Sequence, residues 1–174
     1  MPRNRGAWGL PALAILVLAA PYGRADVVFE FSSDTSGAWH DASKWDQGYV
    51  PGGTDHVVRI DLMGVDPAIT YSESSGSTQI KGLISSESLI FTGGSLEILE
   101  TATLSGPISL AGGRLIGGTI TTLNSIETNS NGNNTLQGVT LNGVINLTES
   151  SDRLRVYNSL TLNGTADLSG SSSI

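Results

Sequence analysis

The chain has 174 residues with 9 basic and 16 acidic side chains, a formal net charge of −7 and no cysteine. An acidic chain disfavours a nucleic acid or an anionic membrane surface as a partner, and the lack of cysteine excludes disulfides, thiolate catalysis and Cys-based metal sites. Because charged residues make up only 14% of the chain, we expect a surface of mostly Ser, Thr, Asn and Gly.

Residues 1–25 have the pattern of a cleaved secretory signal peptide. Arg3 and Arg5 precede an apolar run over residues 10–20, and a small-x-small pattern that ends at Ala25 predicts cleavage after that residue. The apolar run is shorter than the ~20 residues that cross a bilayer, so we expect no membrane span after cleavage. Removing this segment with its three basic residues leaves 6 basic and 16 acidic residues, a net charge of −10. The chain is therefore predicted to be secreted or displayed on the cell surface.

Residues 26–61 are expected to form an N-terminal aromatic capping segment. They contain the spaced series Trp39, Trp45, Pro51 and Asp55 ahead of a strand-like run. The two tryptophans have two interpretations, a platform that stacks on sugar rings or a hydrophobic plug over the first coil. We favour the plug, because the open end of a solenoid has to be covered and bulky aromatic side chains suit that task.

Residues 62–174 are expected to form the coils of a β-solenoid. Their apolar runs are short, rich in β-branched residues and separated by Gly, which favours strands over helices. The template over residues 102–110 recurs from Val139, out of step with the later repeat, so we expect coils of unequal length in the first part of this segment. From residue 114 onward a 21-residue period is regular.

Four series of residues carry this period. They are Leu115/Leu136/Tyr157, Thr119/Thr140/Thr161, Ile120/Leu141/Leu162 and Ile126/Leu147/Leu168. A coil stacked directly on the preceding one requires such recurrence, whereas an antiparallel sandwich, which remains possible, does not. We therefore predict an all-β fold, a parallel β-helix or β-solenoid, with a coil left incomplete at Ile174. Such a coil would leave a strand edge open to edge-to-edge self-association.

Three features occur together in this sequence: the pair of tryptophans, the run Gly-Gly-Arg-Leu-Ile-Gly-Gly-Thr-Ile over residues 112–120, and the Thr-Leu-Asn-Gly repeats. Together they resemble exported bacterial β-helix proteins of the autotransporter-adhesin-like kind, many of which occur in planctomycetes. The resemblance covers nearly all of the chain after residue 25. It implies a segment of a large surface or secreted protein, and it assigns no functional residue because the shared motifs are structural.

No catalytic residue, metal site or cofactor is predicted. The two histidines, His40 and His56, have no accompanying metal or nucleophile motif, and we expect both to be loop residues near the capping segment. Residues 129–134 are rich in Asn oxygens but carry no carboxylate, and the segment from Asp34 to Gly37 offers only one. A calcium site needs more charged ligands than either loop supplies.

Two features could contact a ligand, although neither assigns binding residues. Asp152, Arg153 and Arg155 form a charged cluster, which we expect to be a solvated corner of a coil rather than a substrate clamp. The threonine series from Thr119 to Thr161 could present a flat face to ice or to a crystalline polysaccharide. The simpler interpretation of this series is hydrogen bonding along the stack.

The sequence thus favours a secreted or cell-surface, structural or adhesin-like β-solenoid segment that has no catalytic activity of its own. Extracellular polysaccharide or other cell-surface components are the expected partners. The alternative is the N-terminal part of a β-helix carbohydrate-active enzyme, a polysaccharide lyase or glycosidase, whose active site lies outside this chain.

Overall fold

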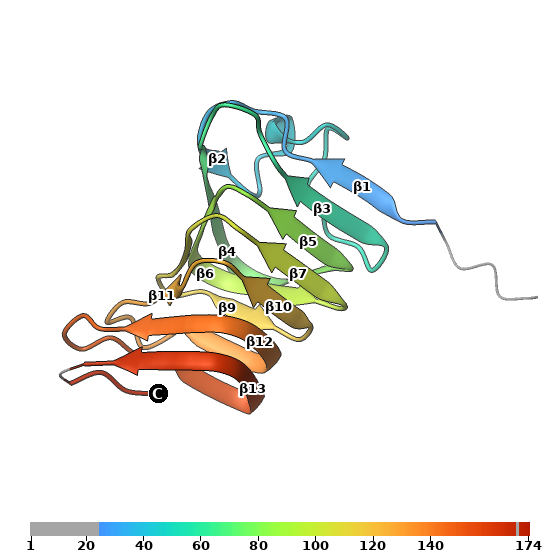
Figure 1. Ribbon diagram of the computed structural model, residues 1–174. Helices are drawn as coiled ribbons and strands as arrows, with labels where there is room; N and C mark the ends of the chain where they lie inside the picture. The colour runs from blue at the N-terminus through green and yellow to red at the C-terminus, as the bar shows by residue number, and fades with distance from the viewer. Residues whose placement is uncertain (1–24, 170) are drawn as a thin grey trace, which may run out of the picture.

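The chain folds into a stack of parallel β-strands, as Figure 1 shows. The computed structural model describes residues 25–169 and 171–174, so the predicted signal peptide lies almost wholly outside the described residues. All pairings between the named strands are parallel. The prediction of an all-β parallel solenoid is confirmed, and the antiparallel sandwich is excluded.

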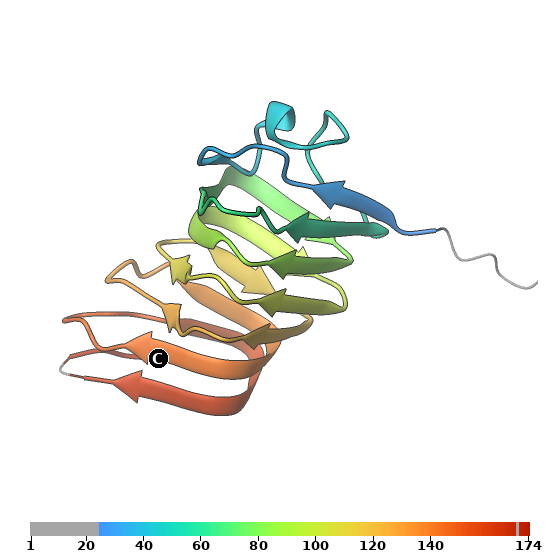
Figure 2. The ribbon, with the colours of Figure 1, turned by 45° about the horizontal axis from the view of Figure 1, so that its top comes forward.

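Each coil crosses three faces of the solenoid, and strands of successive coils pair along each face. The first face contains β1 (Val27–Glu30), β3 (His56–Ile60), β5 (Gly82–Ser85), β7 (Thr101–Leu104) and β10 (Thr119–Thr122). Shorter strands occupy the other two faces, namely β2 (Gly37–Ala38), β8 (Ile108–Leu110) and β11 (Ile126–Glu127) on the second face and β9 (Arg114–Ile116) on the third. Four long strands turn corners and contribute to more than one face: β4 (Ala68–Ile80), β6 (Ser88–Ile98), β12 (Thr135–Leu147) and β13 (Arg155–Leu168). Figure 2 shows the resulting ladder from a second side.

Alternation along each strand separates the core from the surface. On the first face, Ile120 lies opposite Leu141, and both side chains are fully buried. Their neighbours Thr119 and Thr140 are opposite each other as well, and both are partly exposed. A pleated strand sends successive side chains to opposite sides, so each Thr-apolar pair places one residue in the core and one on the surface.

The coils differ in length before the regular segment begins, as the displaced template predicted. On the first face, Val57 lies opposite Gly82, and the next residue, Leu83, lies opposite Ala102. The step from Val57 to Gly82 therefore covers more residues than the step from Leu83 to Ala102. Ala102 is in turn opposite Ile120, which is a shorter step again. Among these first-face steps, only those from Ile120 to Leu141 and from Leu141 to Leu162 follow the 21-residue period.

Two of the four predicted 21-residue series are correct and two are wrong at one position. The threonine series and Ile120/Leu141/Leu162 are in register. Leu136, however, lies opposite Val156, and Tyr157 faces Gln137 on the outside. Likewise Ile126 lies opposite Ile145.

The two errors have one cause, which is that successive coils of equal length distribute their residues differently among the corners. The step from Ile120 to Ile126 is longer than the matching step from Leu141 to Ile145. The later coil makes up the difference partly between the second and third faces and partly between the third and first. The second of these adjustments is a register shift beside Gly138, which has a positive φ of 64°.

The capping segment forms the first coil, and its aromatic rings fill the N-terminal end of the core. Trp39 is completely buried and Trp45 is 2% exposed, with ring centroids 5.1 Å apart. Trp39 also packs on Tyr71, which packs on Phe91 one coil further on. The plug interpretation is therefore confirmed, because rings buried to this degree have no face free for a sugar.

A single helical turn, η1 (Ala42–Lys44), lies at this end of the stack. Asp41 caps it by accepting hydrogen bonds from the Ser43 hydroxyl at 2.6 Å and the Ser43 N–H at 3.0 Å. These bonds lower the pKa of Asp41 from its ordinary value of 3.8. The stabilisation is present above that value and is lost as the pH falls through the lowered pKa. Across the described residues, no helix is long and apolar enough to cross a membrane.

Replacing Trp45 should destabilise the cap in two separable ways. Trp45→Ala should lower the free energy of unfolding by about 3–5 kcal/mol because it removes a large buried ring. Trp45→Phe keeps much of the ring but loses the Nε1–H that donates to the Trp39 carbonyl at 2.7 Å, so a smaller loss of about 1–3 kcal/mol is expected. Urea denaturation measures both. Met63→Ala, at a 98% exposed side chain, is the control, and a comparable loss there would contradict the assignment.

Gly106 should tolerate no side chain, because a Cβ atom at this position would overlap the main chain of Ser86 and Glu87 in the preceding coil. Gly106→Ala is expected to cost about 1–3 kcal/mol of stability. At Gly132 a Cβ would meet only the guanidinium ends of Arg155 at 3.6 Å and Arg153 at 4.0 Å. Gly132→Ala should therefore change stability by less than about 0.5 kcal/mol. Equal thermal unfolding curves for the two variants would refute this account of coil stacking.

Candidate functional site

A polar groove of about 520 Å³ lies on the outside of the solenoid, where the second face turns into the third. Its walls come from successive coils, so residues far apart in the sequence line it together. The side chains that matter for its chemistry are Thr92, Arg114, Asn131, Asn133, Thr135 and Arg155. Hydrogen-bond donors and two guanidinium groups therefore dominate the groove.

The two arginines occupy the same vertical column of the third face. Arg114 at the start of β9 lies opposite Thr135 of β12, and Thr135 lies opposite Arg155 of β13. Adjacent strands are ~4.8 Å apart, so the two arginine backbones are separated by about twice that distance. The threonine between them donates its hydroxyl to the Asn133 carbonyl at 2.8 Å.

The loop over residues 129–134 forms one wall of the groove, and Asn134 fixes its shape. This side chain is fully buried. Its Nδ2 donates to the carbonyls of Asn129 at 2.9 Å and Arg153 at 3.0 Å, and its Oδ1 accepts from the Gly112 N–H at 2.6 Å. One asparagine thus ties together three coils, and a fully satisfied buried amide of this kind rigidifies its surroundings.

The side-chain oxygens of Asn129 and Asn131 are engaged in local turns of this loop. Asn129 Oδ1 accepts from the Asn131 N–H at 3.0 Å, and Asn131 Oδ1 accepts from the Asn133 N–H at 3.0 Å. Asn131 Nδ2 donates to the Ala111 carbonyl at 3.2 Å. Three of the side-chain oxygens that could have served as calcium ligands, those of Asn129, Asn131 and Asn134, therefore accept backbone hydrogen bonds instead.

The charged cluster near the end of the chain separates into two parts. Asp152 is 2% exposed, and its Oδ2 accepts a hydrogen bond from the Glu149 N–H at 3.1 Å. Arg153 and Arg155 are exposed instead, and both guanidinium groups reach the loop at Gly132, whose Cβ position lies 4.0 Å from Arg153 and 3.6 Å from Arg155. The expected solvated corner is therefore also a wall of the groove.

Tyr157 lies beside the groove as an exposed aromatic ring. Its side chain is 46% exposed, and the Arg114 guanidinium carbon is 5.8 Å from the ring centroid. This cation–π distance holds the ring near the arginine column. Sequence reasoning placed Tyr157 in the core series and missed this contact. The missed signal was the spacing of Arg114, Thr135 and Arg155, which follows the repeat closely.

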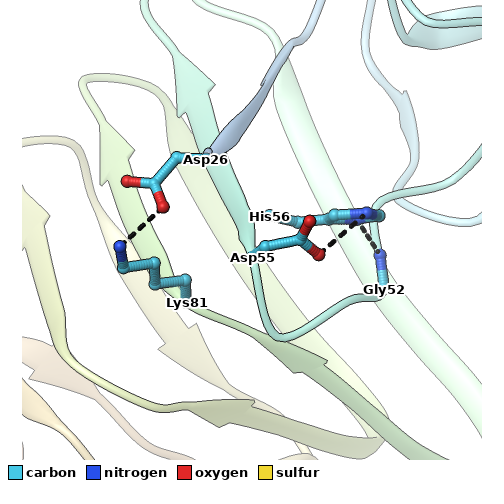
Figure 3. A network of polar contacts seen from close by, with 5 residues as sticks. All are labelled: Asp26, Gly52, Asp55, His56 and Lys81. Carbon is cyan, nitrogen blue, oxygen red and sulfur yellow. Dashed lines mark hydrogen bonds and ion pairs between the residues drawn. The ribbon is translucent and has the colours of Figure 1, made fainter. Parts of the chain in front are cut away.

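The two histidines lie at the opposite end of the stack. His56 begins β3 rather than lying in a loop, and its ring packs on Phe29 with centroids 4.4 Å apart. Figure 3 shows that it also accepts a hydrogen bond from the Gly52 N–H at 3.0 Å and lies 3.9 Å from Asp55. His40 packs on Tyr71 at 4.9 Å. These contacts give both rings structural roles in the first coil.

Figure 3 also shows the ion pair that fastens the chain ahead of β1. Lys81 Nζ donates to Asp26 Oδ1 at 2.6 Å, and this hydrogen bond raises the pKa of Lys81 above its ordinary value of 10.5. A raised lysine pKa contributes stability below the ordinary value and loses it as the pH rises through the raised one. The pair therefore persists at neutral pH.

The outward threonine column is longer than the sequence indicated. Thr101 lies opposite Thr119, so four threonines from Thr101 to Thr161 follow one another on the first face. Hydrogen bonding along the stack occurs in the neighbouring column, where Asn163 donates to Asn142 at 2.8 Å and Asn142 donates to Thr121 at 3.1 Å. These bonds use side chains to reinforce the ladder.

Within residues 25–169 and 171–174, no three His, Cys, Asp or Glu side chains come close enough together to hold a metal ion. No family model, no curated protein and no solved structure matches the chain.

Proposed function

We propose that this chain is a segment of an exported, adhesin-like β-solenoid that acts structurally and has no catalytic activity of its own. The observation that carries the proposal is strand β13. It crosses all three faces and pairs with β12 along nearly its whole length. Among the described residues its other edge pairs with no strand, and the isolated bridge between Arg153 and Ser173 lies just ahead of β13. An edge of this kind is a template for another strand.

The side chains of β13 support the same function. Leu162 lies directly under Leu141 but is only partly buried, whereas Leu141 is fully buried. Leu168 is 54% exposed, although its partner Leu147 is fully buried. The side chains of β12 are more buried because β13 covers them, whereas no described strand covers β13 on its other side. A strand of a second copy of the chain would bury this apolar surface and extend the stack.

The competing function is the N-terminal part of a β-helix enzyme that acts on polysaccharides. The polar groove supports this alternative, because a groove that runs across parallel coils can hold an extended polymer. The two functions differ in their products. An enzyme releases shortened or unsaturated sugars from a polysaccharide, whereas an adhesin-like segment leaves the polymer intact.

Assembly through β13 should depend on the inward side chains of that strand. The full chain is expected to show concentration-dependent association by light scattering, and Leu162→Lys should suppress it, because an inward-pointing charge blocks strand addition. Thr161→Lys, which places the same charge on the outward side, is the matched control and should still associate. Association that is equal in both variants, with unchanged circular dichroism, would contradict the proposed role of β13.

Export should be visible in the mass of the processed protein. In a bacterial host with a general secretory pathway, the full chain should appear outside the cytoplasm with Asp26 as its first residue, because cleavage is predicted after Ala25. N-terminal sequencing and intact mass measure this. Replacing Ala25 with Trp should prevent cleavage, since a bulky residue does not fit the small-residue site. An unprocessed chain that stays in the cytoplasm would refute the proposed localisation.

A further inference from the structure

We propose that the groove between the second and third faces binds an anionic polysaccharide. In this site Arg114 and Arg155 hold carboxylate or sulfate groups and Tyr157 stacks on a sugar ring. This inference rests on the exported, adhesin-like function proposed above and names the class of ligand that such a segment contacts.

The distribution of charge is the first argument. The segment from residue 26 onward carries six basic side chains against sixteen acidic ones, yet three of the six, Arg114, Arg153 and Arg155, gather at this one corner. No carboxylate of the described side chains lies within 4 Å of these three arginines, whereas Lys81 has both Asp26 and Glu100 within that distance. Guanidinium groups that gather without a carboxylate partner among the described side chains form a local site for anions on an acidic protein.

The chemistry of arginine limits the kinds of chemical group that the ligand can carry. Its planar guanidinium donates two parallel hydrogen bonds to the oxygens of a carboxylate or sulfate group and always carries its charge. Arg114 and Arg155 are two rungs apart on one column, which places their backbones about 10 Å apart at the usual strand spacing. Two anchors at this separation along the stack suit a polymer whose negative charges recur along its length better than one small anion.

The aromatic ring distinguishes a sugar polymer from other polyanions. Tyr157 exposes 46% of its side chain next to Arg114, and an exposed aromatic ring beside polar donors offers the apolar C–H face of a pyranose a stacking surface. A nucleic acid would carry a phosphate at every nucleotide across a surface of net negative charge. Such a ligand suits the acidic remainder of this chain poorly.

The groove is also built before any ligand arrives. Asn134, fully buried and hydrogen-bonded to Gly112, Asn129 and Arg153, locks the loop that forms one wall. Thr135 stands between the two arginines with its hydroxyl already directed to Asn133. A preformed site loses less conformational entropy on binding, so the few charged contacts available suffice for measurable affinity.

The test is affinity electrophoresis and calorimetry of the full chain with four polymers: polygalacturonate, dextran sulfate, neutral dextran and double-stranded DNA. Binding to polygalacturonate, dextran sulfate or both, weakened by added salt, is expected, with neither neutral dextran nor DNA retained. The first two polymers distinguish a carboxylate from a sulfate ligand. Arg114→Gln and Arg155→Gln should each weaken binding on the order of tenfold, because each removes charge-assisted hydrogen bonds. Tyr157→Ala should weaken it as well, and Tyr157→Phe should retain it.

Arg59→Gln is the matched control, because Arg59 is an exposed arginine of β3 on the first face, away from the groove. It should bind as the unchanged chain does. Binding to neither anionic polymer, an equal loss in the Arg59 variant, or retention of DNA or neutral dextran at similar strength would overturn the inference. Such a result would leave the tests of assembly through β13 and of export unaffected, so the two proposals fail separately.

Discussion

The vertical register between coils is the constraint on which the rest of this structure depends. Each residue of a coil lies ~4.8 Å from its counterpart in the next. Each side chain therefore has to be compatible with the side chains at the same position in the coils above and below it. Apolar residues stacked in this way pack against one another, as in the continuous series from Ile120 to Leu162. Like charges stacked in the same way repel each other, and directly opposed like charges destabilise a strand pair. The same constraint therefore accounts for a chain with 14% charged residues and a surface of Thr and Asn.

The arginine groove follows the same rule in a different way. Arg114 and Arg155 share a column but never lie opposite each other, because Thr135 separates them. The intervening rung doubles the distance between the two strands that carry the charges and reduces their mutual repulsion. A spacing that the stack requires for its own stability is thus also the spacing that two anchoring groups need to hold separate charges of one ligand.

The sequence was sufficient to predict the fold, because stacked coils of equal length produce a repeat of fixed period in the sequence. The first-face series could be read correctly since Thr and its apolar neighbour recur together and leave only one possible register. The series through Tyr157 could not, because a register shift beside Gly138 turns a predicted core residue outward. The groove was hidden for a related reason. Its arginines are far apart in the sequence, and only the pairing of both with Thr135 brings them together.

The corners of the coils have a consequence for how this fold can change. The two coils that follow Ile120 keep the 21-residue period while the division of residues among their corners varies. The number of residues in these coils is therefore conserved, although the positions of their corners are not. The strands set the pitch of the stack and the corners do not. Lengthening the loop over residues 129–134 at Gly132, away from the buried Asn134, would consequently reshape the wall beside Arg155 while the apolar core residues stay in place. Ligand preference and structural stability can therefore evolve in different parts of the same coil.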